Sequence, residues 1–298
     1  MALNYHIHDN GWTVMIDDFD FAKITQQEVN ELGRLLATNT CVVARNQAHL
    51  TVEDELRICE MVGNVEDLSE FAHLPPYSYV LLPGSKSKMQ RVTGGLDDHG
   101  NPGLFGHVSD LDWHCNMPGV PTRKPLVWLM GVTGTAGSRT SWTNNIMAYN
   151  DLSVSMKDCI KDLKMVCGWR KDSYSAMDFG VAKGGVTEDF NEHYNPSLVH
   201  TNNAGKTGLF FPFLQFRNFV GMTEDQSREF IKPLVDHVLQ EKYMYHHDWQ
   251  DGDVVISEQW LGIHKRWKFD GMADRILHRG TFDFANCDLS PLAQEVDQ

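Results

Sequence analysis

The stretch Leu111-Asp-Trp-His-Cys-Asn-Met-Pro118 is the starting point for interpreting this chain. On an extended strand, side chains two positions apart project from the same face, so we expect His114 and Asn116 to point together. Cys115 between them would face the other way, and we assign it to packing. An imidazole nitrogen and an amide oxygen can both bind a metal ion, and the stretch therefore indicates a candidate metal site.

A histidine two residues before an asparagine is a weak signal by itself, because a hydrogen-bonded histidine at a strand end is a common structural feature. A second stretch strengthens it, namely Trp260-Leu-Gly-Ile-His264 followed by Asp274-Arg-Ile-Leu-His-Arg279. Arg275 follows His264 by eleven positions and Arg279 follows it by fifteen. This spacing is the most specific signal in the sequence.

Together the two stretches resemble the Fe(II)- and 2-oxoglutarate-dependent oxygenases of the taurine dioxygenase (TauD/TfdA-like) family. The resemblance extends over nearly the whole chain. It implies a mainly β fold with flanking helices, built on a double-stranded β-helix, which is also called a jelly roll and is cupin-like. It also implies a dioxygenase that uses Fe(II), 2-oxoglutarate and O2. Such an enzyme would hydroxylate a small-molecule metabolite while 2-oxoglutarate is decarboxylated to succinate.

The resemblance implies roles for particular residues. His114 and His264 match the two iron-binding histidines of the family, and Arg275 matches the arginine that pairs with the distal carboxylate of 2-oxoglutarate. Thr140 matches a threonine whose hydroxyl also holds this co-substrate. Arg279 matches an arginine that contacts the sulfonate of the substrate in taurine dioxygenase. A structural ion pair is the alternative role for Arg279.

These residue types suit the chemistry. A non-heme Fe(II) oxygenase holds its metal with two imidazoles and a carboxylate, and leaves positions open for the co-substrate and O2. The planar guanidinium of arginine binds a carboxylate through two parallel hydrogen bonds. The chain departs from the pattern at one position, because Asn116 stands where the family has aspartate. An amide oxygen brings no charge, so we expect weaker Fe(II) binding with Asn116 still serving as a ligand.

The asparagine leaves other interpretations open. It is a native ligand, a substitution of aspartate, or the mark of a metal-poor or non-catalytic relative that binds a small molecule on the same barrel. Asp110 and Asp112 are alternative carboxylate ligands. A halogenase, in which a small residue leaves room for a halide, is less favoured because asparagine is as large as aspartate.

We expect a single domain over residues 1–298, with a helical scaffold and the first strands over about 1–70 and the jelly-roll core over about 77–285. The stretches 94–110 and 168–195 have several glycines and little periodicity, and they are candidate lids over the site. His107 in the first of them is a candidate substrate contact.

Local patterns predict individual elements. Capping signals at Thr25, Thr51 and Thr223 each precede a helix with apolar residues at helical spacing. The apolar run Pro125–Val132 predicts a strand that is buried on both faces. The turn Trp249-Gln-Asp-Gly252 lies between two strand-like runs and predicts a β-hairpin.

Composition limits the class of function. The formal net charge of -14 argues against nucleic acid and against an anionic membrane surface as partners. No apolar stretch approaches the ~20 residues of a membrane span. The six cysteines form no Cys-x-x-Cys pair, so a reducing cytoplasm is the expected compartment. A small molecule is the expected binding partner, and the sequence leaves both a monomer and a homo-oligomer open.

Overall fold

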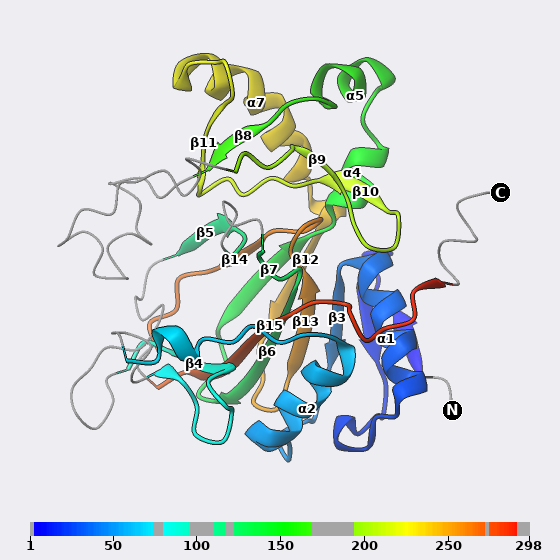
Figure 1. Ribbon diagram of the computed structural model, residues 1–298, viewed down its shortest axis with the longest axis vertical. Coiled ribbons are helices and arrows are strands. Elements are labelled where there is room, and N and C mark those ends of the chain that lie inside the picture. Colours follow the sequence, from blue (N-terminus) through cyan, green and yellow to red (C-terminus); the bar gives the residue numbers. More distant parts are fainter. Residues whose placement is uncertain are drawn as a thin grey trace.

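Two β-sheets that face each other form the centre of the molecule (Figure 1). The computed structural model describes residues 3–73, 80–95, 110–116, 122–167, 194–271 and 274–290. Within these residues, the larger sheet consists, in spatial order, of β1 (Tyr5–Ile7), β2 (Val14–Ile16), β3 (Cys41–Ala44), β13 (Val254–Glu258), β6 (Leu126–Thr133), β15 (Ile276–Phe282) and β4 (Met89–Thr93). The smaller sheet consists of β12 (Met244–Asp248), β7 (Arg139–Thr143), β14 (His264–Arg266) and β5 (Leu111–His114). These facing sheets confirm the predicted jelly-roll core.

The two faces of the larger sheet pack against different layers. In β6, Trp128 and Met130 belong to a core shared with the first two helices. The alternating residues Val127 and Leu129 face the smaller sheet and line the cavity between the sheets. A strand that is buried on both faces is apolar throughout, which is why the sequence of β6 predicted it correctly.

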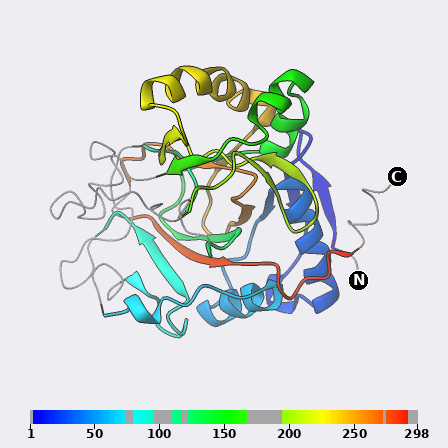
Figure 2. The same ribbon diagram turned by 45° about the horizontal axis from the view of Figure 1, so that its top comes forward.

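Helices α1 (Gln26–Asn39) and α2 (Val52–Val62) cover the outer face of the larger sheet (Figures 1 and 2). They begin after the predicted caps Thr25 and Thr51. In each, the threonine hydroxyl accepts the N–H of the third helical residue, whose carboxylate accepts the N–H of the threonine. This reciprocal cap satisfies N–H groups that have no partner within the first helical turn.

A second apolar core lies beyond the smaller sheet, in the lobe at the top of Figure 1. The lobe comprises α4 (Asn145–Asn150), α5 (Val154–Ile160), α7 (Glu224–Val238), the strand pair β8 (Met165–Cys167) and β11 (Phe216–Phe219), and the strand pair β9 (Val199–Thr201) and β10 (Thr207–Leu209). Helix α7 begins at the predicted cap Thr223. Short 3-10 helices are η1 (Phe21–Lys23), η2 (Ser69–Phe71) and η4 (Glu241–Tyr243).

The hairpin predicted at Trp249–Gly252 was wrong. The strand before the turn, β12, pairs with β7 in the smaller sheet, whereas the strand after it, β13, pairs with β3 and β6 in the larger sheet. Gly252 has a φ of +88°, so the tight turn itself is present. The turn carries the chain from one sheet to the other, and it places Trp249 in the core between them.

The described residues include no helix that is long and apolar enough to cross a membrane. The two candidate lids fall almost entirely outside the described residues, as does His107.

Candidate active site

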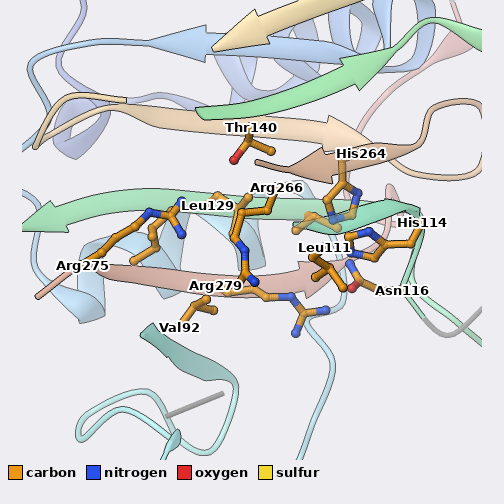
Figure 3. A pocket seen from close by; sticks show the side chains of 12 residues that line it. Val92, Leu111, His114, Asn116, Leu129, Thr140, His264, Arg266, Arg275 and Arg279 are labelled. Carbon is orange, nitrogen blue, oxygen red and sulfur yellow. The ribbon is translucent and has the colours of Figure 1, made fainter. Parts of the chain in front are cut away.

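A cavity between the two sheets contains six of the seven residues singled out from the sequence. Its lining residues are Val92, Leu111, His114, Asn116, Val127, Leu129, Thr140, His264, Arg266, Arg275, Leu277 and Arg279. In Figure 3, His114, His264 and Asn116 lie together at one end and Arg275 lies at the other. None of the described lining residues is acidic, and three are arginines. The cavity therefore favours anionic ligands.

His114 and His264 face each other from neighbouring strands, with ring centroids 4.1 Å apart. Nδ1 of His114 lies 2.6 Å from the carbonyl oxygen of Asp112. Because a carbonyl oxygen only accepts, Nδ1 carries the hydrogen and Nε2 keeps its lone pair. Burial lowers the pKa of His114 to about 4, and burial, His114 and Arg279 lower the pKa of His264 well below its usual value. Both imidazoles are therefore neutral near pH 7, which is the form that binds a metal.

A bulge in β5 determines which side chains reach the cavity. His264 pairs with His114 and Arg266 pairs with Leu111, so two residues two positions apart on β14 face two residues three positions apart on β5. The extra residue lets both His114 and Leu111 line the cavity, whereas Asp112 is exposed. The strand ends at His114, earlier than we expected, and Asn116 reaches the cavity from just beyond the strand end.

The two alternative carboxylates point elsewhere. One oxygen of Asp110 and one oxygen of Asp112 each lie 3.3 Å from Nζ of Lys265, and these side chains are 43% and 58% exposed. Neither residue lines the cavity. In the part of the chain that the structure describes, no group of three His, Cys, Asp or Glu side chains could hold a metal ion.

Asn116 fits the position of a third metal ligand beside the two imidazoles. Its Nδ2 is buried and has no hydrogen-bond partner within the described ranges. Turning the amide about its Cβ–Cγ bond would place the oxygen at this position, and an amide oxygen can bind a divalent cation. Two neutral imidazoles and one amide oxygen fit a metal ion, but the set carries no negative charge.

The far end of the cavity suits a carboxylate. Arg275 is only 2% exposed, and its Nε donates to the hydroxyl oxygen of Ser138 at 3.0 Å. Burial, with a contribution from Arg266, lowers the pKa of Arg275 to about 9, so the guanidinium is still protonated near pH 7. A buried cation is stabilised by an anionic partner, and the planar guanidinium matches a carboxylate.

The hydroxyl of Thr140 is oriented by a tryptophan. Nε1 of Trp249 donates to Oγ1 of Thr140 at 2.9 Å. An indole N–H can only donate, so this bond uses the acceptor side of the hydroxyl. The hydrogen of Thr140 is thus available to an acceptor elsewhere, and Thr140 lines the cavity.

Sequence reasoning missed Arg266, which also lines the cavity and is buried. It lies on β14 two residues after His264, so strand alternation was the signal that could have found it. A second cavity adjoins the first and shares Asn116 and Arg279 with it; its lining residues are Glu66, Leu68, Gln90, Asn116, Arg123, Lys124, Gln259, Arg279 and Thr281. Arg279 donates there to the side-chain oxygen of Gln90.

The chain is similar in sequence and fold to known oxygenases. Pentalenolactone F synthase from Streptomyces arenae is 27% identical over 264 residues, which are 84% of this chain and 85% of that protein. The alpha-ketoglutarate-dependent 2,4-dichlorophenoxyacetate dioxygenase of Burkholderia sp. (strain RASC) is 26% identical over 198 residues, 64% of each chain. The structure of AAD-2 in complex with Mn(II) and N-oxalylglycine has the same fold, with a TM-score of 0.76 at 18% identity over 95% of this chain and 98% of that chain.

The family model described as "Taurine catabolism dioxygenase TauD, TfdA family" matches residues 8–281. This match spans nearly all of the 298 residues and includes every described residue of the site. The chain therefore belongs to the TauD, TfdA family, and it is an oxidoreductase of the Fe(II)- and 2-oxoglutarate-dependent dioxygenase class.

Proposed function

We propose that this enzyme hydroxylates a small molecule with an anionic group, and that His114, His264 and Asn116 hold its Fe(II). The observation that carries the proposal is the cavity with two buried neutral imidazoles at one end and a buried arginine at the other. Bound Fe(II) would supply the redox chemistry that activates O2. The protein supplies the ligands, the orientation of both substrates and a site shielded from water.

In this proposal 2-oxoglutarate lies along the cavity, with its distal carboxylate at Arg275. The guanidinium provides charge-assisted hydrogen bonds, and the hydroxyl hydrogen of Thr140 provides a further one. Ser138 and Trp249 hold these two side chains in place before the co-substrate arrives. Side chains that are already held in place lose less conformational entropy when the co-substrate binds.

The prime substrate would occupy the second cavity, which reaches Asn116. Arg123 and Arg279 contribute positive charge there, and Glu66 contributes one carboxylate. Lys124 also lines this cavity, and its ammonium pairs with Asp283 at 2.8 Å. Two relatives are named for 2,4-dichlorophenoxyacetate and (S)-phenoxypropionate, and both of those compounds are carboxylates. Cationic lining residues and anionic substrates of relatives together support a carboxylate or sulfonate as the substrate.

Substitution of Arg275 tests the co-substrate site. Charge-assisted hydrogen bonds contribute about 1.5–3 kcal/mol, so Arg275→Ala should weaken 2-oxoglutarate binding about 10- to 100-fold, and Thr140→Ala should cost less. Calorimetric titration of 2-oxoglutarate into the Co(II)-loaded protein measures this. Arg139→Ala is the control, because Arg139 is exposed beside Thr140 and pairs with Asp248. Equal affinity in Arg275→Ala and the parent protein would show that another cation holds the co-substrate.

A turnover assay tests the reaction itself. Fe(II)-loaded enzyme under air should release succinate from 2-oxoglutarate faster when the correct carboxylate or sulfonate is added. The uncharged ligand set favours one other function, that of a binding protein without catalysis. Binding of 2-oxoglutarate without succinate release, across a panel of aryloxy acids, amino acids and sulfonates, would support that second function.

A further inference from the structure

Two glutamine side chains hold the peptide group that precedes Asn116. The carbonyl oxygen of Cys115 accepts a hydrogen bond of 2.7 Å from Nε2 of Gln215. The N–H of Asn116 donates a hydrogen bond of 2.7 Å to Oε1 of Gln259. The carbonyl and the N–H belong to one planar peptide group and point in opposite directions. The peptide therefore cannot rotate without breaking both hydrogen bonds.

Both glutamines are buried, and Gln259 is also fixed by further hydrogen bonds. Gln215 is 0% exposed, and its Oε1 has no hydrogen-bond partner in the described residues, whereas Gln259 is 2% exposed. Nε2 of Gln259 donates to the carbonyl oxygen of Lys124 at 2.6 Å, and its backbone N–H donates to Pro125 at 2.7 Å. A buried amide with such bonds has one orientation, because a flipped amide would place two donors or two acceptors together.

Gln259 also connects two of the candidate metal ligands, Asn116 and His264. It lies in the turn between β13 and β14, five residues before His264. The side-chain carboxyl group of Glu258, whose pKa burial raises to about 8, accepts the backbone N–H groups of Trp260 at 2.8 Å and Leu261 at 3.0 Å, which holds this turn in shape. One turn thus leads into His264 and also fixes the backbone of Asn116.

We propose that Gln215 and Gln259 are positioning residues that aim the side chain of Asn116 at the metal. The inference rests on the proposed role of Asn116 as a ligand. A carboxylate has two equivalent oxygens and attracts a cation through its charge, whereas an amide has one oxygen and no charge. A neutral ligand therefore depends more strongly on its direction, and the two hydrogen bonds to its peptide group provide that direction.

Metal binding to the chelator-treated full-length protein tests this without turnover. Gln215→Met and Gln259→Met keep the side-chain size and lose the hydrogen bonds. Each should weaken Co(II) binding about 10- to 100-fold, the usual effect of removing groups that orient metal ligands. The titration contains no prime substrate, because Gln259 also lines the second cavity. The visible Co(II) spectrum of both variants should shift toward that of Asn116→Ala.

Gln47→Met is the matched control. Gln47 is also 2% exposed. Its side-chain amide makes three backbone hydrogen bonds: it accepts from the N–H of Phe21 at 3.0 Å and donates to the carbonyl oxygens of Phe19 at 2.7 Å and Arg45 at 2.8 Å. It does not line the cavity, so Gln47→Met should lower the thermal unfolding midpoint and leave Co(II) affinity within about 2-fold of the parent, well below the effect expected at the two positioning residues.

A double-mutant cycle separates positioning from general damage. In the Asn116→Ala background, adding Gln259→Met should cause no further loss of Co(II) affinity, because the side chain that it positions is absent. An equal loss in both backgrounds overturns the inference, as does unchanged affinity in both glutamine variants. A parent protein that binds no Co(II) even with 2-oxoglutarate present overturns the proposed function itself. Because Gln215 and Gln259 lie in different turns, just before β11 and just after β13, either variant provides the test if the other does not fold.

Discussion

Asn116 is the residue that most strongly sets the character of this site. We expect from the resemblance that it stands where the family has aspartate. It lines both cavities and has a buried amide nitrogen without a partner in the described residues. With asparagine the ligand set is neutral, and the described lining of the first cavity is positively charged. Metal retention should therefore depend on an anionic co-substrate, and binding of the two should be cooperative and reciprocal.

Replacing this asparagine with aspartate tests the argument. Asn116→Asp should raise affinity for Co(II) alone, because it adds one negative charge in a partly buried site, by on the order of 1–3 kcal/mol. The cooperativity between metal and 2-oxoglutarate should fall accordingly. Calorimetric titrations with and without 2-oxoglutarate measure both quantities.

The control for this variant is Asn150→Asp, which makes the same charge change at an exposed position at the end of α4. Its Co(II) affinity should match the parent. If Asn116→Asp also matches the parent, Asn116 is not a ligand.

At the scale of elements, the turn that connects the two sheets positions the residues at the end of the cavity where we propose that 2-oxoglutarate binds. The turn after β12 crosses from the smaller to the larger sheet and buries Trp249 between them. From there the indole N–H reaches Thr140 on β7, and its ring lies 5.9 Å from the guanidinium of Arg275. One side chain in the crossing thus contacts both residues that we propose bind 2-oxoglutarate.

Removing the indole N–H should therefore weaken co-substrate binding. Trp249→Phe keeps an aromatic ring but frees the hydroxyl of Thr140 to turn, so 2-oxoglutarate affinity should fall about 3- to 10-fold, the effect of one ordinary hydrogen bond. Trp128→Phe is the control, because its indole donates to Glu55 at 2.8 Å on the opposite face of the larger sheet. Titration of the Co(II)-loaded proteins compares them, and equal affinities in both variants would exclude the orienting role.

At the scale of the whole molecule, the site lies in the interior between the sheets, so its ionisation is linked to global unfolding. The pKa of His114 falls to about 4 in the folded protein, and that of His264 falls well below its usual value, mainly through burial. Below pH 6.5 the unfolded chain binds protons at these positions and the folded protein does not. The contribution of these two histidines to the free energy of unfolding is therefore fully present above pH 6.5 and is lost as the pH falls toward 4.

The prediction concerns the metal-free protein. When the pH is lowered from 7 to 5.5, each of the two histidines should reduce the free energy of unfolding by on the order of 1 kcal/mol. His264→Gln removes one such group, so this variant should lose less stability than the parent over the same range. Urea unfolding in the presence of a chelator measures the difference, and parallel pH profiles for the two proteins would contradict it.

Several parts of the fold and the site could be predicted from the sequence because their causes are local. Thr25, Thr51 and Thr223 signal helix starts through contacts within four residues. The apolar run of β6 signals a strand buried on both faces. The resemblance to the family identified six residues that the structure brings into one cavity, although their spacing along the chain spans both sheets.

The remaining features depend on which strands become neighbours, and no short stretch of sequence contains that information. The Asp-Gly turn before β13 looks like a hairpin, but both edges of β13 are occupied by β3 and β6, so the turn has to cross between the sheets. The bulge in β5 arises from its pairing with β14, and it turns Asp112 out while Leu111 and His114 face in. The chemistry of the site was thus determined by residue types that can be read in the sequence. Its geometry arises from contacts between distant segments, such as the hydrogen bonds of Gln215 and Gln259 to the peptide group before Asn116, which join residues about 100 and 143 positions apart.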